Sequence, residues 1–252
     1  MNYIEQLKEL YEKNTKHSNY QILSKKLTEI ISNDQIVVKT RHELERFNFV
    51  TDYIDFENKS VLDIGGNTGY FSFESLEKGA NLVHHYEGNK EHSDFVKMAA
   101  KALEYEDKVI ITNDYFKFKN EIEHNYDVTF LLNVLHHLGD DYGNKEISKD
   151  EAKKQMSEQL KSMASITNVL IFQMGYCWKG DREKNLFEKG IKEEVISFVK
   201  NASSGIFEII EIGIPFQKDD VIIYDKMNSE NIKRYDSLGE FLNRPLFILK
   251  ST

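Results

Sequence analysis

The stretch from Val61 to Tyr70 combines residue types that could hold a charged small molecule. It reads Val-Leu-Asp-Ile-Gly-Gly-Asn-Thr-Gly-Tyr, a short apolar run that stops at two adjacent glycines. Glycine lets the backbone turn sharply and approach a ligand without a Cβ in the way. A dinucleotide-binding loop needs the spacing G-x-G-x-x-G, which this stretch does not keep. The carboxylate of Asp63 would repel a pyrophosphate and suit an ammonium group, so the pattern predicts a small-molecule loop of another kind.

Further polar side chains stand where other apolar runs end. A carboxylate in such a place can accept hydrogen bonds from ribose hydroxyls. The adjacent histidines His136 and His137 closely follow a long buried run, and an imidazole with an ordinary pKa of about 6.5 can accept a proton near neutral pH. The side chains at the ends of the runs are Glu87, Asn113, Asp114 and Asn133.

Alternating strands and helices must position these residues. Short strands that alternate with helices of ten or more residues are typical of a parallel sheet covered on both faces. We therefore expect an α/β fold with a doubly wound, Rossmann-like sheet of seven mostly parallel strands. The strands are expected at 61–64, 82–86, 108–112, 126–132, 169–173, 206–212 and within 241–249, and the helices between them after 70, at 89–104, at 148–164 and at 183–200.

Amphipathic helical patterns precede the first expected strand. They have apolar residues at helical spacing and no strand partner. We expect residues 1–57 to form an N-terminal helical cap and residues 58–252 to form the ligand-binding domain. The polar, turn-rich stretch 217–240 is expected to be an inserted loop. The three helical patterns cover 2–13, 20–31 and 41–54.

Composition excludes several classes of protein. The 252 residues carry 33 Lys plus Arg against 42 Asp plus Glu, a net charge of −9, and no long basic run. A protein that binds nucleic acid or an anionic membrane needs clustered cations, so we expect neither partner. The single cysteine, Cys177, forbids an intrachain disulfide and a thiolate metal cluster, and we expect no metal. Without a signal-peptide pattern or an apolar run of roughly 20 residues, the sequence predicts a cytoplasmic protein with no membrane insertion.

The chain resembles the class I S-adenosylmethionine-dependent methyltransferases over about residues 60–250. Their first motif is an acidic residue followed by a glycine-rich turn at the end of the first strand. Asp63, Gly65 and Gly69 match this motif, while Asn67 replaces the commoner central glycine. The resemblance implies S-adenosylmethionine as the cofactor, bound at the carboxyl ends of the strands.

The resemblance also implies individual roles in cofactor binding. Glu87 would accept the ribose hydroxyls, and Asn113 with Asp114 would lie where the family receives the adenine amino group. Asn133 would face the methionine end and the transferred methyl group. The cofactor-binding set is therefore Asp63, Gly65, Gly66, Asn67, Gly69, Glu87, Asn113, Asp114 and Asn133.

Methyl transfer from a sulfonium is an in-line displacement, so the enzyme must align the nucleophile, the methyl group and the sulfur. A hydroxyl nucleophile must also lose a proton. By position, His136 or His137 is the expected catalytic base, with Asp140 and Asp141 as backups or as groups that orient the imidazole. Of the two, His136 is preferred because it lies nearer the end of the strand. An amine acceptor could lose its proton to water instead.

The segment 173–182 offers candidate acceptor-binding residues. The Trp178 ring could stack on a sugar, and Lys179 and Arg182 could hold a phosphate, although an ordinary loop with a packed tryptophan explains the pattern equally well. Arg244-Pro245 resembles the entry to the last strand of bacterial polysaccharide methyltransferases. No proline follows Asn133, which disfavours enzymes that methylate the amino groups of nucleic acid bases.

The sequence thus predicts an S-adenosylmethionine-dependent O-methyltransferase. Its acceptor would be a small molecule, a sugar or a nucleotide-linked sugar in bacterial surface-glycan biosynthesis. Two alternatives stay open: an RNA-modifying methyltransferase, which the acidic charge disfavours, and a non-catalytic cofactor-binding subunit, which the intact motif set disfavours.

Overall fold

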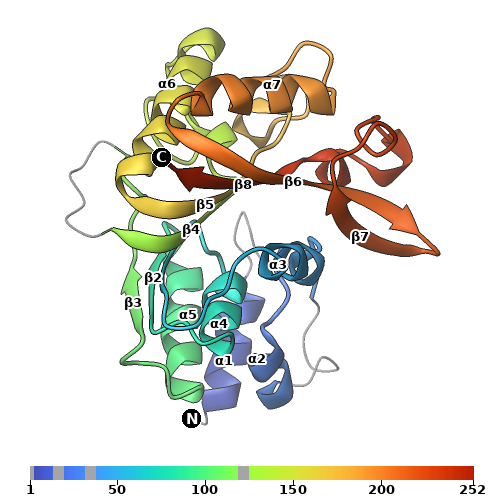
Figure 1. Ribbon diagram of the computed structural model, residues 1–252. Helices are drawn as coiled ribbons and strands as arrows, with labels where there is room; N and C mark the ends of the chain where they lie inside the picture. The colour runs from blue at the N-terminus through green and yellow to red at the C-terminus, as the bar shows by residue number, and fades with distance from the viewer. Residues whose placement is uncertain (1–2, 14–19, 32–37, 119–124) are drawn as a thin grey trace. The chain divides into compact units, whose positions relative to one another are not determined.

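The computed structural model describes residues 3–13, 20–31, 38–118 and 125–252 (Figure 1). The chain divides into two compact units. The first runs up to Phe47 and from Thr51 to Phe116, and the second comprises Asn48–Val50 and Lys117–Thr252. Each unit has its own strands and helices and is described by itself.

The first unit contains a parallel sheet in the order β3-β2-β1. Strand β1 is buried on both faces, since the adjacent Val61 and Leu62, whose side chains point to opposite faces, are fully buried. Helices α4 and α5 connect the strands and pack on them, so the unit follows the β-α-β-α-β pattern expected from the sequence. The elements are β1 (Ser60–Ile64), α4 (Tyr70–Glu77), β2 (Leu82–Tyr86), α5 (Lys90–Ala102) and β3 (Val109–Thr112).

The N-terminal helices pack into the first unit. Helix α1 lies along α5 (Figure 1), with the rings of Tyr11 and Phe95 5.6 Å apart. Leu7, Leu27 and Ile31 are fully buried, so this segment adds to the hydrophobic core of the unit. That the helices also cap a ligand stays a prediction. They are α1 (Tyr3–Glu12), α2 (Lys25–Ile30) and α3 (Glu43–Thr51), the last of which contributes residues to both units.

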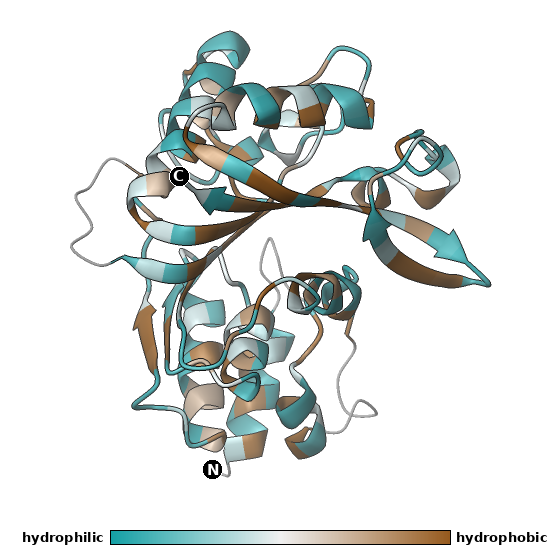
Figure 2. Ribbon diagram, in the orientation of Figure 1, coloured by the Kyte–Doolittle hydropathy of each residue, from teal (hydrophilic) through white to brown (hydrophobic). Residues whose placement is uncertain are grey.

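The second unit contains strands in the order β4-β5-β8-β6-β7. Only β4 and β5 are parallel; β8 is antiparallel to both β5 and β6, and β7 is antiparallel to β6. Figure 2 shows long hydrophobic stretches on these strands and a mostly hydrophilic α6. The elements are β4 (Tyr126–Leu132), α6 (Lys149–Ser162), β5 (Thr167–Gln173), α7 (Lys192–Ser203), β6 (Phe207–Lys218), β7 (Val221–Lys226) and β8 (Leu246–Ser251).

The described chain has eight strands, so the expectation of seven is wrong, and the strands are less uniformly parallel than expected. The additional strand, β7, lies inside the stretch 217–240 that the sequence predicts to be a loop. Asp219 and Asp220 have φ of 48° and 63°, which is the backbone of a tight two-residue hairpin turn. Aspartate tolerates this conformation, so the polar pair makes a hairpin rather than a long loop.

The helix expected at 183–200 begins only at Lys192. The residues before it form bends and turns, and the carboxylate of Glu194 accepts hydrogen bonds from the amides of Lys189 (2.9 Å) and Ile191 (3.3 Å). A side chain that satisfies these amides at the first turn sets the helix start. Among the described residues, no helix is both long and apolar enough to cross a bilayer.

Candidate active site

The loop between β1 and α4 turns on residues with left-handed backbone conformations. Gly65 and Gly69 have φ of 68° and 84°, and Asn67 between them has φ of 54°. Glycine adopts this region freely and asparagine tolerates it. The amide of Gly69 donates to the carbonyl of Gly66 at 2.9 Å and closes the turn. The loop residues named from the sequence therefore form one tight structure at the end of β1.

Gly66 permits a close approach between this loop and the strands below it. A Cβ at this position would overlap Cε1 and Nδ1 of His85 and lie 2.7 Å from Oδ2 of Asp63. His85 and Asp63 are 0% and 3% exposed. The Ser72 hydroxyl donates to Oδ2 of Asp63 at 2.7 Å and lies 2.9 Å from Nδ1 of His85. The loop thus rests on a buried carboxyl, hydroxyl and imidazole.

Burial sets the charges of this cluster. It raises the pKa of Asp63 to about 7, and it lowers the pKa of His85 to about 3. The 3.8 Å between His85 Nδ1 and Asp63 Oδ2 is therefore a contact of two uncharged groups at mildly acidic pH. The sequence gives no signal for this contact beyond the position of His85 within an apolar strand.

Backbone amides hold the Glu87 carboxylate at the end of β2. Its Oε2 accepts from the amide of Asn67 at 2.8 Å, and its Oε1 accepts from the amide of Asn89 at 2.7 Å. Glu87 therefore joins the glycine loop to the start of α5. A carboxylate oxygen can accept more than one hydrogen bond.

The end of β3 lies beside the end of β2. The Asn113 side chain donates to the carbonyl of Glu87 at 2.9 Å, and Asp114 Oδ1 accepts from the amide of Tyr115 at 2.8 Å. Tyr115, which sequence reasoning did not select, is 47% exposed, and a Cβ on Gly88 would lie 2.6 Å from its ring. The structure thus places Glu87, Asn113, Asp114 and an exposed aromatic ring at one edge of the sheet.

Gln21, from the N-terminal segment, completes the glycine loop. Its side-chain oxygen accepts from the amide of Tyr70 at 3.0 Å and from the hydroxyl of Thr68 at 3.1 Å, and Gln21 is 8% exposed. It acts as the cap of α4, satisfying an amide that the helix itself leaves unpaired. Because Gln21 is far from the loop along the chain, local sequence patterns could not identify it.

In the second unit, the end of β4 is held by a network of side chains. Asn133, with φ of 62°, donates from its side chain to Gln173 Oε1 at 3.0 Å and accepts at Oδ1 from Arg244 Nη1 at 2.7 Å. Arg244 also pairs with Glu240, whose Oε1 accepts from the amide of Tyr176 at 3.0 Å. Burial would raise the pKa of Glu240, but Arg244 holds it below its ordinary value.

His136 lies in the 3-10 turn Leu135–His137 and is 2% exposed. Its Nδ1 accepts a hydrogen bond from the amide of Gly175 at 3.2 Å, which leaves the ring proton on Nε2. Burial, and then the charge of Arg244, lowers the pKa of His136 well below its ordinary value. His136 is therefore a neutral ring whose Nδ1 is already engaged.

His137 is partly exposed and has a carboxylate partner. Its Nδ1 lies 3.1 Å from Oδ2 of Asp141, with exposed side-chain fractions of 18% and 20%. A carboxylate at this distance can stabilise the imidazolium when the ring takes up a proton. One ligand atom from each of His137, Asp140 and Asp141 lies within 4.8 Å of the others. This spacing would permit a cation, but half-exposed acidic groups often lie so without one, and we propose no metal.

The three residues expected to bind the acceptor differ in their surroundings. Trp178 is buried, its Nε1 donates to the carbonyl of Leu138 at 2.8 Å, and Lys179 lies over its ring at 4.7 Å. The Lys179 ammonium donates to the carbonyl of Lys145 at 2.9 Å. Arg182 is exposed. The packed indole therefore leaves Arg182 as the member of this set that is open to a ligand.

No protein-family model and no curated protein matches this chain. Solved structures do share its fold. The bifunctional kinase-methyltransferase WbdD matches with a TM-score of 0.57 and 14% identity over 97% of this chain and 46% of WbdD. The magnesium protoporphyrin IX methyltransferase ChlM from Synechocystis PCC 6803, solved with bound SAM, matches with a TM-score of 0.51 and 12% identity over 100% of this chain and 98% of ChlM.

These similarities establish the fold. The chain has the Rossmann-like α/β fold of S-adenosylmethionine-dependent methyltransferases, and it spans about half the length of WbdD.

Proposed function

We propose that this protein is an S-adenosylmethionine-dependent methyltransferase. The observation that carries the proposal is the joint between the glycine loop and Glu87, whose carboxylate is held 2.8 Å from the amide of Asn67. This joint holds a carboxylate beside the glycine loop, and the missing Cβ of Gly66 lets that loop lie directly on His85 and Asp63. The shared fold with two methyltransferase structures supports the same function.

The donor and acceptor groups of the first unit fit this cofactor. Glu87 would accept hydrogen bonds from the ribose hydroxyls. The edge formed by Asn113, Asp114 and Tyr115 combines an amide, a carboxylate and an exposed aromatic ring, which suits a purine base. Asp63, being buried beneath the loop, would support the glycine loop rather than contact the cofactor's ammonium group. Asn133 is proposed for the methionine end. Bound S-adenosylmethionine would supply an electrophilic methyl group.

We propose a hydroxyl acceptor, with His137 as the base. Its Nε2 would take the hydroxyl proton while Asp141, 3.1 Å from Nδ1, stabilises the imidazolium that forms. His136 suits this role less well, because its Nδ1 is engaged by Gly175 and its pKa is held low by burial. His136 would instead fix the segment after β4. A sugar or nucleotide-linked sugar as the acceptor, with Arg182 on a phosphate, stays a proposal.

Calorimetric titration of the full-length protein with S-adenosylmethionine, S-adenosylhomocysteine and NAD tests the cofactor. We expect the first two to bind and NAD not to bind. Glu87→Gln should weaken S-adenosylmethionine binding by about tenfold or more, since a hydrogen bond to a charged group is worth about 1.5–3 kcal/mol. Glu106→Gln makes the same change at an exposed position of the first unit and should leave binding intact.

Two results would overturn the assignment. The first is NAD binding without S-adenosylmethionine binding. The second is an equal dissociation constant for the wild type, Glu87→Gln and Glu106→Gln, which would place the ribose elsewhere. Transfer of a radiolabelled methyl group to nucleotide sugars but not to RNA would separate the O-methyltransferase from an RNA-modifying enzyme, and binding without transfer to any acceptor would indicate a non-catalytic subunit.

A further inference from the structure

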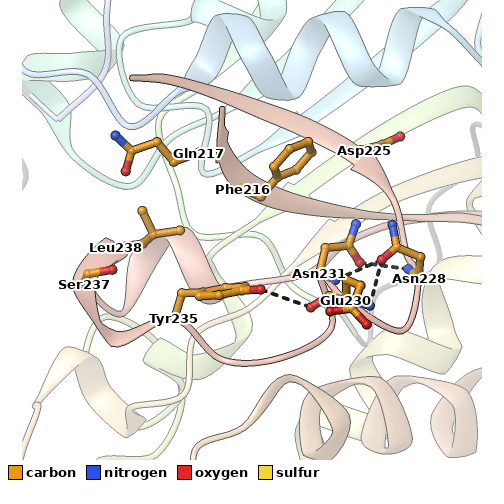
Figure 3. A pocket seen from close by; sticks show the side chains of 9 residues that line it. All are labelled: Phe216, Gln217, Asp225, Asn228, Glu230, Asn231, Tyr235, Ser237 and Leu238. Carbon is orange, nitrogen blue, oxygen red and sulfur yellow. Dashed lines mark hydrogen bonds between the residues drawn. The ribbon is translucent and has the colours of Figure 1, made fainter. Parts of the chain in front are cut away.

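A pocket of about 400 Å³ lies in the second unit, formed by the β6–β7 hairpin and the chain that follows it. None of its lining residues has a role in the proposed methyl transfer. Its size falls within the range of small-molecule sites, which is roughly 300–1,000 Å³. Figure 3 shows the side chains around it: Phe216, Gln217, Asp225, Asn228, Glu230, Asn231, Tyr235, Ser237 and Leu238.

One wall of the pocket is a self-bonded turn after β7. The amide of Asn228 donates to Oδ1 of Asn231 at 2.8 Å, and Oδ1 of Asn228 accepts from the amides of Glu230 and Asn231, both at 2.9 Å. The Asn231 side chain also donates to the carbonyl of Lys226 at 2.9 Å. These bonds, drawn in part in Figure 3, fix the turn without a ligand.

A second wall is Tyr235, which is anchored from two sides. Oδ1 of the buried Asn243 accepts from the amide of Tyr235 at 2.9 Å, and the Asn243 side chain donates back to its carbonyl at 2.8 Å. The ammonium of Lys192 lies 5.3 Å from the centre of the ring and donates to the carbonyls of Asn231 and Lys233 at 2.8 and 2.7 Å. The pocket is therefore preformed, which lowers the entropy cost of binding.

The lining selects against anions. The nine residues include two carboxylates, Asp225 and Glu230, and no lysine or arginine. Glu230 pairs at 2.9 Å with Lys233, which lies outside the lining, and the Lys192 ammonium lies over the Tyr235 ring. The charge of Asp225 remains, and it disfavours a phosphate or a nucleotide. The pocket consequently takes a neutral or a cationic ligand.

The remaining groups suit a ligand with several hydroxyls. Asp225 uses Oδ1 for the amide of Lys226, which leaves Oδ2 as an acceptor, and Gln217 donates to Asp220 and retains its amide oxygen. Ser237 adds a hydroxyl that both donates and accepts. Phe216 and Tyr235 add two aromatic rings, which can pack on the C–H face of a pyranose (Figure 3).

We propose that this pocket binds a neutral sugar unit of the methyl acceptor. That the sugar belongs to a methyl acceptor rests on the proposed function, whereas the sugar site itself is inferred from the pocket alone. The pocket wall is continuous with the end of β4, because Asn243 is followed directly by Arg244, which donates to Asn133 at 2.7 Å. A sugar bound here would hold a glycan acceptor on the second unit of the protein. The bound sugar residue would not be the one that is methylated.

Ligand-observed NMR on the full-length protein tests the site, with the methyl glycosides of mannose, glucose and galactose as neutral probes. Tetramethylammonium and inorganic phosphate serve as the cationic and anionic probes. We expect at least one glycoside to bind and phosphate not to bind. Asp225→Asn and Phe216→Ala should each weaken that glycoside by about fivefold to tenfold, the effect of losing one charge-assisted hydrogen bond or one stacking face.

Matched controls make the same changes outside the lining. Asp219→Asn lies in the same hairpin at its turn, and Tyr3→Ala removes a ring that is 56% exposed in α1. Both should bind the glycoside as the wild type does. The thermal unfolding midpoint of each variant shows whether it is folded, and Asp225→Asn, which keeps its shape, remains informative if Phe216→Ala unfolds.

The outcomes separate this inference from the proposed function. Equal glycoside affinity in the wild type, Asp225→Asn and Phe216→Ala would overturn the sugar site. So would the absence of binding of all three glycosides to the wild type, whether or not tetramethylammonium binds. Loss of glycoside binding in the two variants supports it, even in a protein that fails to bind S-adenosylmethionine. In that case the proposed methyltransferase function, and not the sugar site, would be wrong.

Discussion

Removing either Asp63 or His85, which form a buried pair, should change how the free energy of unfolding depends on pH. Folding raises the pKa of Asp63 from 3.8 to about 7 and lowers that of His85 from 6.5 to about 3, in both cases chiefly through burial. Between about pH 4 and 6.5, the folded state therefore keeps a proton on Asp63 that the unfolded state lacks. Over the same range it lacks a proton on His85 that the unfolded state carries. The two effects cancel in the wild type.

Each single variant should expose one effect. In Asp63→Asn, only His85 contributes: the unfolded state binds the extra proton, so the free energy of unfolding rises as the pH rises. In His85→Gln, only Asp63 contributes: the folded state binds the extra proton, so the free energy of unfolding falls as the pH rises through the same window. One proton corresponds to about 1.4 kcal/mol per pH unit, so each variant should change by about 2 kcal/mol between about pH 4.5 and 6, with opposite signs.

Urea unfolding of the wild type and both variants at half-unit steps across this range measures the effect. Subtracting the wild-type profile removes the contribution of the other titrating groups. The control Glu106→Gln should run parallel to the wild type. If the profiles of Asp63→Asn and His85→Gln also run parallel to it, neither pKa is displaced by folding and the reasoning from burial fails. If the free energy of unfolding changes with pH in the same direction in both variants, the two groups are not each buried in the neutral form.

Three further predictions concern the loop, its cap and the base. Gly66→Ala should destabilise the protein by about 1–3 kcal/mol in urea unfolding, because the new Cβ would overlap the His85 ring, whereas Gly205→Ala meets no atom within 4 Å and its cost should reflect only its φ of 71°. Gln21→Ala should cost about 1 kcal/mol by the same assay, since it removes the α4 cap; no loss would show that water replaces the side chain. With a hydroxyl acceptor identified, His137→Ala should lower kcat by about 10²–10⁴ with little change in cofactor affinity, and full activity in that variant would exclude His137 as the base.

Local sequence patterns determined the parallel strands of the first unit and the residues at their ends. Apolar runs bounded by glycine and polar residues depend on nearest neighbours, so the positions of β1, β2 and β3 could be predicted. Parallel strands bring their carboxyl ends to one edge, which is why Gly65, Glu87 and Asn113 could be placed at one edge of the sheet from the sequence. The structure around Asp219 and Asp220 could not be predicted as well, because aspartate pairs occur both in loops and in hairpin turns.

Only the tertiary structure decided which side chains hold the strand ends of each unit and in which charge state. Gln21 caps α4, Ser72 joins Asp63 to His85, and Arg244 bonds to Asn133, each across a long separation in the chain. Such contacts depend on how elements pack, and no periodicity encodes them. The two adjacent histidines are alike in sequence, yet burial and the amide of Gly175 hold His136 neutral while His137 meets a carboxylate. Their difference is one of environment, because desolvation and local hydrogen bonds set the pKa of an imidazole.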